Sequence, residues 1–191
     1  MPPPPEDGGQ HDLPGDPVSV ARAICLRQLT DRQRTRAELA TALRRKGVPD
    51  DAARTVLDRF AEVGLIDDAA TAENYALVQH RRRGLAARAV AGKLRQRGLD
   101  EDTIRTALMP IDASSEQAAA SALVARKLPA IRHLEPSVQA RRMYGLLARR
   151  GYSAAIASTV ITALISHTEH SLTNREEWWA TDDSSDSDVS G

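Results

Sequence analysis

The sequence predicts an all-α protein built from three tandem three-helix repeats between two acidic tails. Aromatic residues make up only 3% of its 191 residues, and no segment alternates apolar and polar residues over the length of a strand. In addition, one short phrase occurs three times. It consists of a leucine, three residues that include at least two cations, a glycine and an apolar residue, and it reads LRRKGV at 43–48, LRQRGL at 94–99 and LARRGY at 147–152.

The three phrases belong to a longer frame. An apolar residue lies four positions before each leucine, and an apolar pair lies nine and ten positions after each glycine. The glycines, Gly47, Gly98 and Gly151, are separated by 51 and then 53 residues. This frame predicts a helix that stops at the glycine, a tight turn, and a second helix that packs back on the first. A further amphipathic helix is predicted before each pair, over about 17–30, 68–83 and 113–131.

Local signals place several helix ends. Asp16 is a predicted N-cap with Pro17 at the first helical position, and Thr35 followed by Glu38 has the order of a capping box. The helix that begins at Thr35 is predicted to run to Lys46 and to stop at the glycine.

The turn that follows each glycine also has a recognisable start signal. Asp100 and Ser153 stand two residues after their glycines, where an N-cap for the next helix belongs. The first copy has Pro49 there and Asp50 next, so its turn is expected to shift by one residue.

Each unit of roughly 50 residues is short in apolar bulk, so neighbouring units are expected to bury each other's faces. We therefore expect an elongated, curved array and a chain that is monomeric when free. Low apolar content predicts disorder at both ends. The predicted segments are a Pro/Gly-rich acidic tail at 1–16, repeats at 17–66, 67–111 and 112–167, and an acidic tail with Trp178 and Trp179 at 168–191.

The formal net charge of zero hides an uneven distribution. Residues 1–16 contain four acidic and no basic residues, and 168–191 contain seven acidic residues and one arginine. Residues 17–167 therefore hold 25 of the 26 basic residues against 15 acidic ones, a net charge of +10. A basic body of this kind favours a polyanionic partner.

Many of the cations recur at the ends of the predicted helices. A cation at a helix C-terminus stabilises the helix by about 0.3–1 kcal/mol, because it interacts favourably with the negative end of the helix dipole. That effect accounts for one cation per repeat but not for two or three. The candidate contact residues are Arg44, Arg45, Lys46, Arg81, Arg82, Arg83, Arg95, Arg97, Arg149 and Arg150.

Signals for catalysis, cofactors and membranes are missing from the sequence. The Gly-Lys pair at 92–93 lacks the earlier glycine and the following Ser or Thr of a phosphate loop, and the five histidines are scattered. A single cysteine, Cys25, lies in an apolar helical stretch, where a buried small residue is expected. No run is long enough to span a membrane. We therefore expect a cytoplasmic protein that is not an enzyme, with no cofactor, metal or small-molecule substrate.

Two stretches resemble the family of bacterial RecX regulatory proteins. They are RTRAELATALRRKGV at 34–48 and VGLIDDAATAENYALVQHRRRGLAARAVAGKLRQRGL at 63–99. The most specific features are Gly-Leu-Ile-Asp-Asp at 64–68, the aromatic Tyr75, the arginine cluster and Gly84. The resemblance covers about 17–167. It implies a protein that binds the RecA filament on single-stranded DNA and restrains its growth. RecA's ATPase, strand-exchange and co-protease activities, and with them DNA repair and the SOS response, would then be modulated.

Two other functions remain open from the residues alone. A helix, tight turn and helix is also the outline of a helix-turn-helix DNA-binding protein. However, the helices that follow the first two glycines begin with acidic residues, which DNA phosphates would repel. A helical-repeat adaptor with a purely protein partner is the other alternative. Its binding would resist salt, whereas DNA-assisted binding falls steeply with ionic strength.

Overall fold

The computed structural model describes residues 15–163, and every regular element in this range is helical. The elements are α1 (Pro17–Asp31), α2 (Arg36–Arg45), α3 (Asp50–Glu62), α4 (Asp68–Arg83), α5 (Ala87–Gln96), α6 (Glu101–Leu108), α7 (Ala113–Lys127), the 3-10 turn η1 (Leu128–Ala130) and α8 (Pro136–Arg149), and residues 154–163 are also helical. The all-α prediction is confirmed. Most of the two predicted tails, including the tryptophan pair, lies outside the described residues.

The predicted helix starts form as expected. The carboxylate of Asp16 accepts the backbone N–H of Ser19 at 3.0 Å, and Pro17 is the first residue of α1. At the start of α2, the Thr35 hydroxyl accepts the N–H of Glu38 at 3.1 Å, while the Glu38 carboxylate accepts the N–H of Thr35 at 3.0 Å. This reciprocal pair satisfies two N–H groups that the helix itself leaves without partners.

The threefold phrase encodes three copies of one helix ending. In each copy the apolar residue after the glycine donates its backbone N–H to the carbonyl of the leucine. These bonds are 3.1 Å from Val48 to Leu43, 3.3 Å from Leu99 to Leu94 and 3.1 Å from Tyr152 to Leu147. The glycines have φ of +74°, +79° and +89°. This is the Schellman motif, which requires a left-handed residue that glycine adopts without strain and an apolar residue that packs back on the helix.

Two helix boundaries differ from the expectation. The turn after Gly47 is not shifted, because Pro49 itself takes the N-cap position of α3 with the extended backbone that a cap requires. Proline is tolerated there because this position needs no N–H. The helix expected over 113–131 ends at Lys127 and continues as η1. Pro129 has no N–H with which to extend the α-helical hydrogen-bond ladder.

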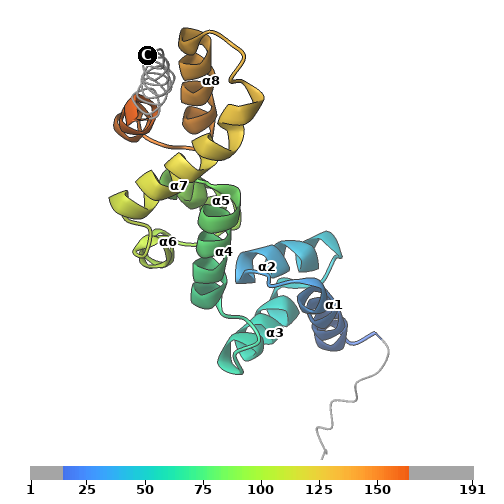
Figure 1. The fold of residues 1–191 in the computed structure, drawn as a ribbon. Coiled ribbons are helices and arrows are strands. Elements are labelled where there is room, and N and C mark those ends of the chain that lie inside the picture. The colour runs from blue at the N-terminus through green and yellow to red at the C-terminus, as the bar shows by residue number, and fades with distance from the viewer. Residues whose placement is uncertain (1–14, 164–191) are drawn as a thin grey trace, which may run out of the picture. The chain divides into compact units, whose positions relative to one another are not determined.

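The described residues divide into two compact units. Unit 1 comprises residues 15–76 and 91–108, and unit 2 comprises 77–90 and 109–163. In unit 1, α1, α2 and α3 pack against one another (Figure 1). Their shared core includes Leu39, Leu43, Val56, Leu57 and Phe60, each at most 6% exposed.

Unit 2 has its own core, formed by α7, α8 and the helical residues 154–163. Its most buried apolar residues include Leu123, Val124, Leu147, Tyr152 and Ile161. The two apolar cores therefore contain the leucines and the apolar residues of the first and third phrases. Burial of these side chains is the main source of helix stability in units of this size.

Candidate functional site

The cations proposed as contacts lie on helix ends, so their surroundings depend on how those ends pack. In unit 1 the end of α5 contacts the start of α2, and we call this contact the first joint (residues 35–38 with 96–98). A Cβ placed on Gly98 would lie 2.4 Å from the Cβ of Ala37. The Thr35 hydroxyl, itself fully buried, donates to the carbonyl of Arg97 at 2.7 Å. Glycine is therefore needed at position 98 for close approach as well as for its backbone angle.

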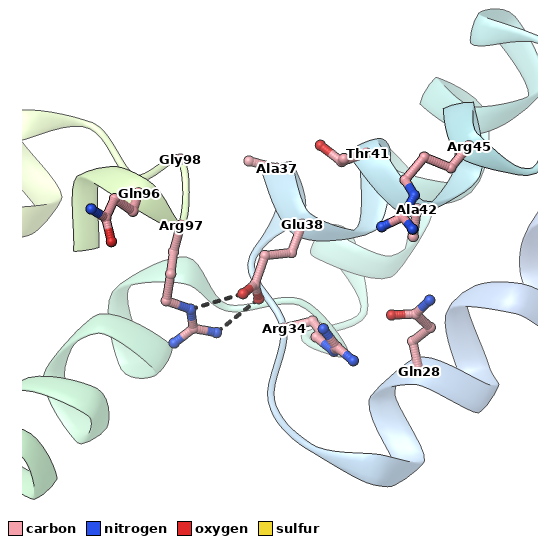
Figure 2. A pocket seen from close by; sticks show the side chains of 10 residues that line it. All are labelled: Gln28, Arg34, Ala37, Glu38, Thr41, Ala42, Arg45, Gln96, Arg97 and Gly98. Carbon is pink, nitrogen blue, oxygen red and sulfur yellow. Dashed lines mark hydrogen bonds and ion pairs between the residues drawn. The ribbon is translucent and has the colours of Figure 1, made fainter. Parts of the chain in front are cut away.

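The Arg97 side chain belongs to this first joint. Its Nε and Nη2 atoms donate to the two carboxylate oxygens of Glu38 at 3.1 and 2.8 Å (Figure 2). The guanidinium also lies over the ring of Tyr75, 4.9 Å from its centroid, and donates to the carbonyl of Gln33 at 3.2 Å. Only 11% of the Arg97 side chain is exposed. Sequence reasoning proposed Arg97 as a partner contact, but the structure commits its guanidinium to the protein's own residues.

The charge of Glu38 is stabilised by the same contacts. Burial by itself raises the pKa of the Glu38 carboxyl. The hydrogen bonds from Arg97 and from the N–H of Thr35, with the positive charges of Arg97 and Arg32, outweigh burial and lower the pKa below its ordinary value of 4.5. Glu38 is therefore ionised and paired at neutral pH.

Unit 2 contains an equivalent contact, which we call the second joint (residues 84–89 with 149–152). A Cβ on Gly151 would lie 2.7 Å from the Cβ of Ala89. The backbone N–H of Ala86 donates to the carbonyl of Arg150 at 3.0 Å. The Arg150 guanidinium donates to the carbonyl of Arg83. Arg150, like Arg97, therefore has a contact within the protein itself.

The ring of Tyr152 completes the second joint. Its hydroxyl donates to the carbonyl of Gly84 at 3.2 Å, and the side chain is buried. Burial, together with the negative charge of Glu116, raises the pKa of Tyr152 to about 12. Glu116 also accepts the backbone N–H of Ala87 at 2.7 Å. In the first joint Asp68 accepts the N–H of Arg36 in the same way, at 2.9 Å.

The other candidate cations differ in how far they are engaged. Arg95 forms an exposed ion pair with Glu101. Its Nε and Nη2 atoms lie 2.5 and 3.0 Å from the Oε1 and Oε2 atoms of the carboxylate. The remaining seven have exposed side chains, and within residues 15–163 none of them forms an ion pair with a carboxylate. These seven are Arg44, Arg45, Lys46, Arg81, Arg82, Arg83 and Arg149.

Two cavities bring cations together, and sequence reasoning missed several of their residues. In unit 1 a cavity of about 410 Å³ lies between α2 and residues 96–98, lined by Arg45 and Arg97 and by the unpredicted Arg34 (Figure 2). In unit 2 a groove of about 480 Å³ beside α8 is lined by cations from two helices, namely Lys127, Arg141, Arg142 and Arg149. Of these four cations, only Arg149 belongs to the repeated phrase. The phrase therefore did not identify the other three.

The described residues contain no group of three or more His, Cys, Asp or Glu side chains that could hold a metal ion. The side chain of Cys25 is fully buried, as expected, and burial raises the pKa of its thiol to about 11. Among the helices of residues 15–163, none has the length and apolar character to cross a membrane.

These observations define a helical-repeat protein with glycine-based joints and with exposed clusters of cations that lack a carboxylate partner within residues 15–163. Family models for the first, second and third three-helix domains of RecX match residues 21–60, 67–108 and 115–161. The chain belongs to the RecX family of regulatory proteins.

Individual relatives support this assignment. The regulatory protein RecX of Thermobifida fusca is 50% identical over 153 residues, which cover 80% of this chain and 83% of the relative. That of Streptomyces coelicolor is 46% identical over 169 residues, covering 84% and 90%. The crystal structure of RecX from Lactobacillus salivarius shares the fold, with a TM-score of 0.69 and 21% identity, and the match covers 78% of this chain and 97% of that one.

Proposed function

We propose that this protein binds the RecA–single-stranded DNA filament in the bacterial cytoplasm and inhibits RecA. Inhibition would reduce RecA's ATP hydrolysis, strand exchange and co-protease activity, and with them recombination and the SOS response. Family membership supports the choice of partner, since the relatives are named RecX regulatory proteins. The observation that carries the proposal is the set of seven exposed cations that lack carboxylate partners in the described chain.

Unpaired cations are well suited to a filament that contains DNA. An arginine already held by a carboxylate must lose that bond before it contacts a phosphate, whereas Arg44, Arg45 and Lys46 lose nothing comparable. The long side chains of Arg and Lys tolerate small changes in distance, which suits contact with a polymeric surface. Binding of this kind is expected to weaken steeply with salt.

The helix-turn-helix alternative is less well supported. In the first turn of α3, Asp50 and Asp51 are exposed, and in that of α6, Glu101 and Asp102 are exposed. A recognition helix presents its N-terminal residues to base edges between two phosphate backbones. Four exposed carboxylates at those positions oppose that geometry.

RecA's DNA-dependent ATP hydrolysis provides the test. We expect substoichiometric amounts of this protein to slow hydrolysis on single-stranded DNA, because capture of a few filament sites restrains filament growth. The effect should weaken as salt rises from 50 to about 200 mM. An unchanged rate at a one-to-one ratio with RecA would contradict the proposal. Inhibition that is insensitive to salt would favour an adaptor that contacts RecA through apolar surfaces.

A further inference from the structure

The cavity in unit 1 has the features of an anion site that the repeated phrase does not reveal. It lies between α2 and the residues that end α5, and its polar lining consists of Gln28, Arg34, Glu38, Thr41, Arg45, Gln96 and Arg97 (Figure 2). We propose that this cavity binds a phosphodiester group of single-stranded DNA, with Arg34 and Arg45 as the binding residues.

Arg34 carries the strongest indication. Its Nε atom is buried and has no hydrogen-bond partner among the described residues. The guanidinium lies in the cavity between Glu38 and Gln28 (Figure 2). A buried donor without an acceptor is costly to the fold. Since Nε has almost no accessible surface, an acceptor oxygen in the cavity reaches it only after a small movement of the Arg34 side chain. A ligand that makes this hydrogen bond would remove the cost.

The charges of the lining residues favour an anion despite the presence of Glu38. The carboxylate of Glu38 is held by both Nε and Nη2 of Arg97, so these two charges offset each other locally. Arg34 and Arg45 have no carboxylate partner within residues 15–163, so the cavity retains a net positive charge. Guanidinium groups bind phosphate oxygens through paired N–H donors, which gives geometric specificity as well as attraction.

Size and access favour a phosphodiester over a single carboxylate side chain. Thr41, Arg45 and Gln96 are exposed, so the rim of the cavity is open to solvent. The volume of about 410 Å³ exceeds what one carboxylate fills, and Ala37 and Ala42 offer small apolar surface beside the cations. A nucleotide unit brings its charged phosphate to the arginines and its sugar to the alanines.

This inference rests on the proposed function, because the RecA filament would supply the single-stranded DNA. It is nevertheless tested without RecA. Fluorescence anisotropy of a labelled oligothymidine measures binding to the full chain, to Arg34→Gln and to Arg45→Gln. Arg54→Gln is the matched control, because it makes the same charge change at an exposed position of α3 outside the cavity.

We expect Arg34→Gln and Arg45→Gln each to weaken oligothymidine binding about tenfold. Each should also reduce the slope of log K against log salt by about 0.7, the value for one contact to a single strand. Arg54→Gln should change the affinity less than about twofold. Equal effects of all three substitutions would overturn the proposal, because the cations would then act through net charge alone.

Thermal melting separates binding from a structural role. Because Arg34→Met places an apolar methyl group where the buried Nε lies, it removes a donor that has no partner within residues 15–163. We therefore expect its melting temperature to equal or exceed that of the unmodified chain. A lower melting temperature would assign Arg34 to the fold instead and overturn its role as a donor to the ligand. Arg45 is exposed, so its variant keeps the binding test valid in either case.

Three competing probes identify the ligand chemistry. The Nε–H signal of Arg34, observed by NMR, should shift with oligothymidine at micromolar concentration and with inorganic phosphate only at millimolar concentration. A shift with inorganic phosphate at equal or lower concentration would identify a free-phosphate site, and a shift with polyglutamate alone would identify an acidic protein partner. Either result overturns the proposal. An unchanged RecA ATPase would instead count against the proposed function.

Discussion

The first and second joints have the same backbone plan but different side-chain chemistry. In both, a glycine at a helix end stands against an alanine, and the carbonyl of the arginine before that glycine accepts a hydrogen bond. The donor is Thr35 in the first joint and Ala86 in the second. Thr35 lies twelve residues before Gly47, and Ala86 lies twelve residues before Gly98. Thr35 donates its hydroxyl, whereas Ala86 donates its backbone N–H.

The difference shows that the glycines and helix ends determine the joint, while the side chains that reinforce it are interchangeable. The first joint relies on the ion pair between Arg97 and Glu38. The second relies on the Tyr152 hydroxyl and apolar burial. In the first copy of the phrase a Cβ on Gly47 would meet nothing within 4 Å, and Lys46 beside it is exposed. Its cations are therefore available to a partner.

The third copy differs from both, because α8 begins earlier relative to its glycine. The position twelve residues before Gly151 is Gln139, inside α8, and its N–H is already bonded to the carbonyl of Glu135. The third copy thus lacks the donor that Thr35 and Ala86 supply.

The largest expected effect comes from substituting the joint glycines. Gly98→Ala and Gly151→Ala should each cost about 1–2 kcal/mol for the left-handed backbone and about 1–3 kcal/mol more for the contact with Ala37 or Ala89. Gly47→Ala, which carries the backbone cost alone, is the matched control. Urea denaturation measures all three. Equal losses would show that the glycines serve the turns and not the joints.

Substitutions of the reinforcing groups sharpen the comparison. Thr35→Val removes an N-cap, worth about 1–2 kcal/mol, and leaves the Arg97 carbonyl without its donor, for a total of about 2–4 kcal/mol. Tyr152→Phe leaves the Ala86 bond intact and should cost about 1 kcal/mol. Urea denaturation measures both losses of stability, from the shift of the midpoint with the slope m unchanged. A larger loss from Tyr152→Phe would contradict the assigned difference between the joints.

Two ion pairs from neighbouring arginines provide a graded test of burial. The Arg97 and Glu38 side chains are 11% and 19% exposed, whereas those of Arg95 and Glu101 are 54% and 64% exposed. Double-mutant cycles with Gln should give a coupling of about 1–3 kcal/mol for the first pair. The second pair should give a much smaller coupling, because water screens its charges. Similar couplings would mean that the first joint does not depend on this pair.

The pH dependence of stability should also report the Arg97–Glu38 pair, with a smaller effect than the double-mutant cycle. Because the folded-state pKa of Glu38 lies below its unfolded value, the stability from this group is present above pH 4.5 and is lost as pH falls through the lowered pKa. As the pH falls from 5 through the lowered pKa of Glu38, the Glu38→Gln variant should therefore lose less stability than the unmodified chain does. Thermal melts across this range measure the difference, and parallel curves would refute it.

Much of the fold follows from local sequence. The phrase with Gly47, Gly98 and Gly151 specifies a helix ending within six residues, and Thr35 with Glu38 specifies a helix start, so both were predictable. The joints were not, because Arg97 and Glu38 lie 59 residues apart. An arginine that binds a residue of its own protein and an arginine that binds DNA cannot be distinguished by residue type. For that reason the phrase made Arg97 a candidate contact although its guanidinium is bound to Glu38, and Arg34, which lies outside the phrase, was not a candidate.

We propose that the exposed cations without a carboxylate partner in the described residues contact the RecA filament. The most direct measurement is the concentration of protein that half-maximally slows RecA's ATP hydrolysis on single-stranded DNA. We expect the replacement of Arg44, Arg45 and Lys46 by Gln to raise this concentration about tenfold or more. The accompanying loss of stability should not exceed the roughly 1–3 kcal/mol that three cations at a helix C-terminus contribute. Replacing the exposed Arg22, Arg27 and Arg54 by Gln should raise the half-maximal concentration less than about threefold. Equal increases from the two triple variants would contradict the claim.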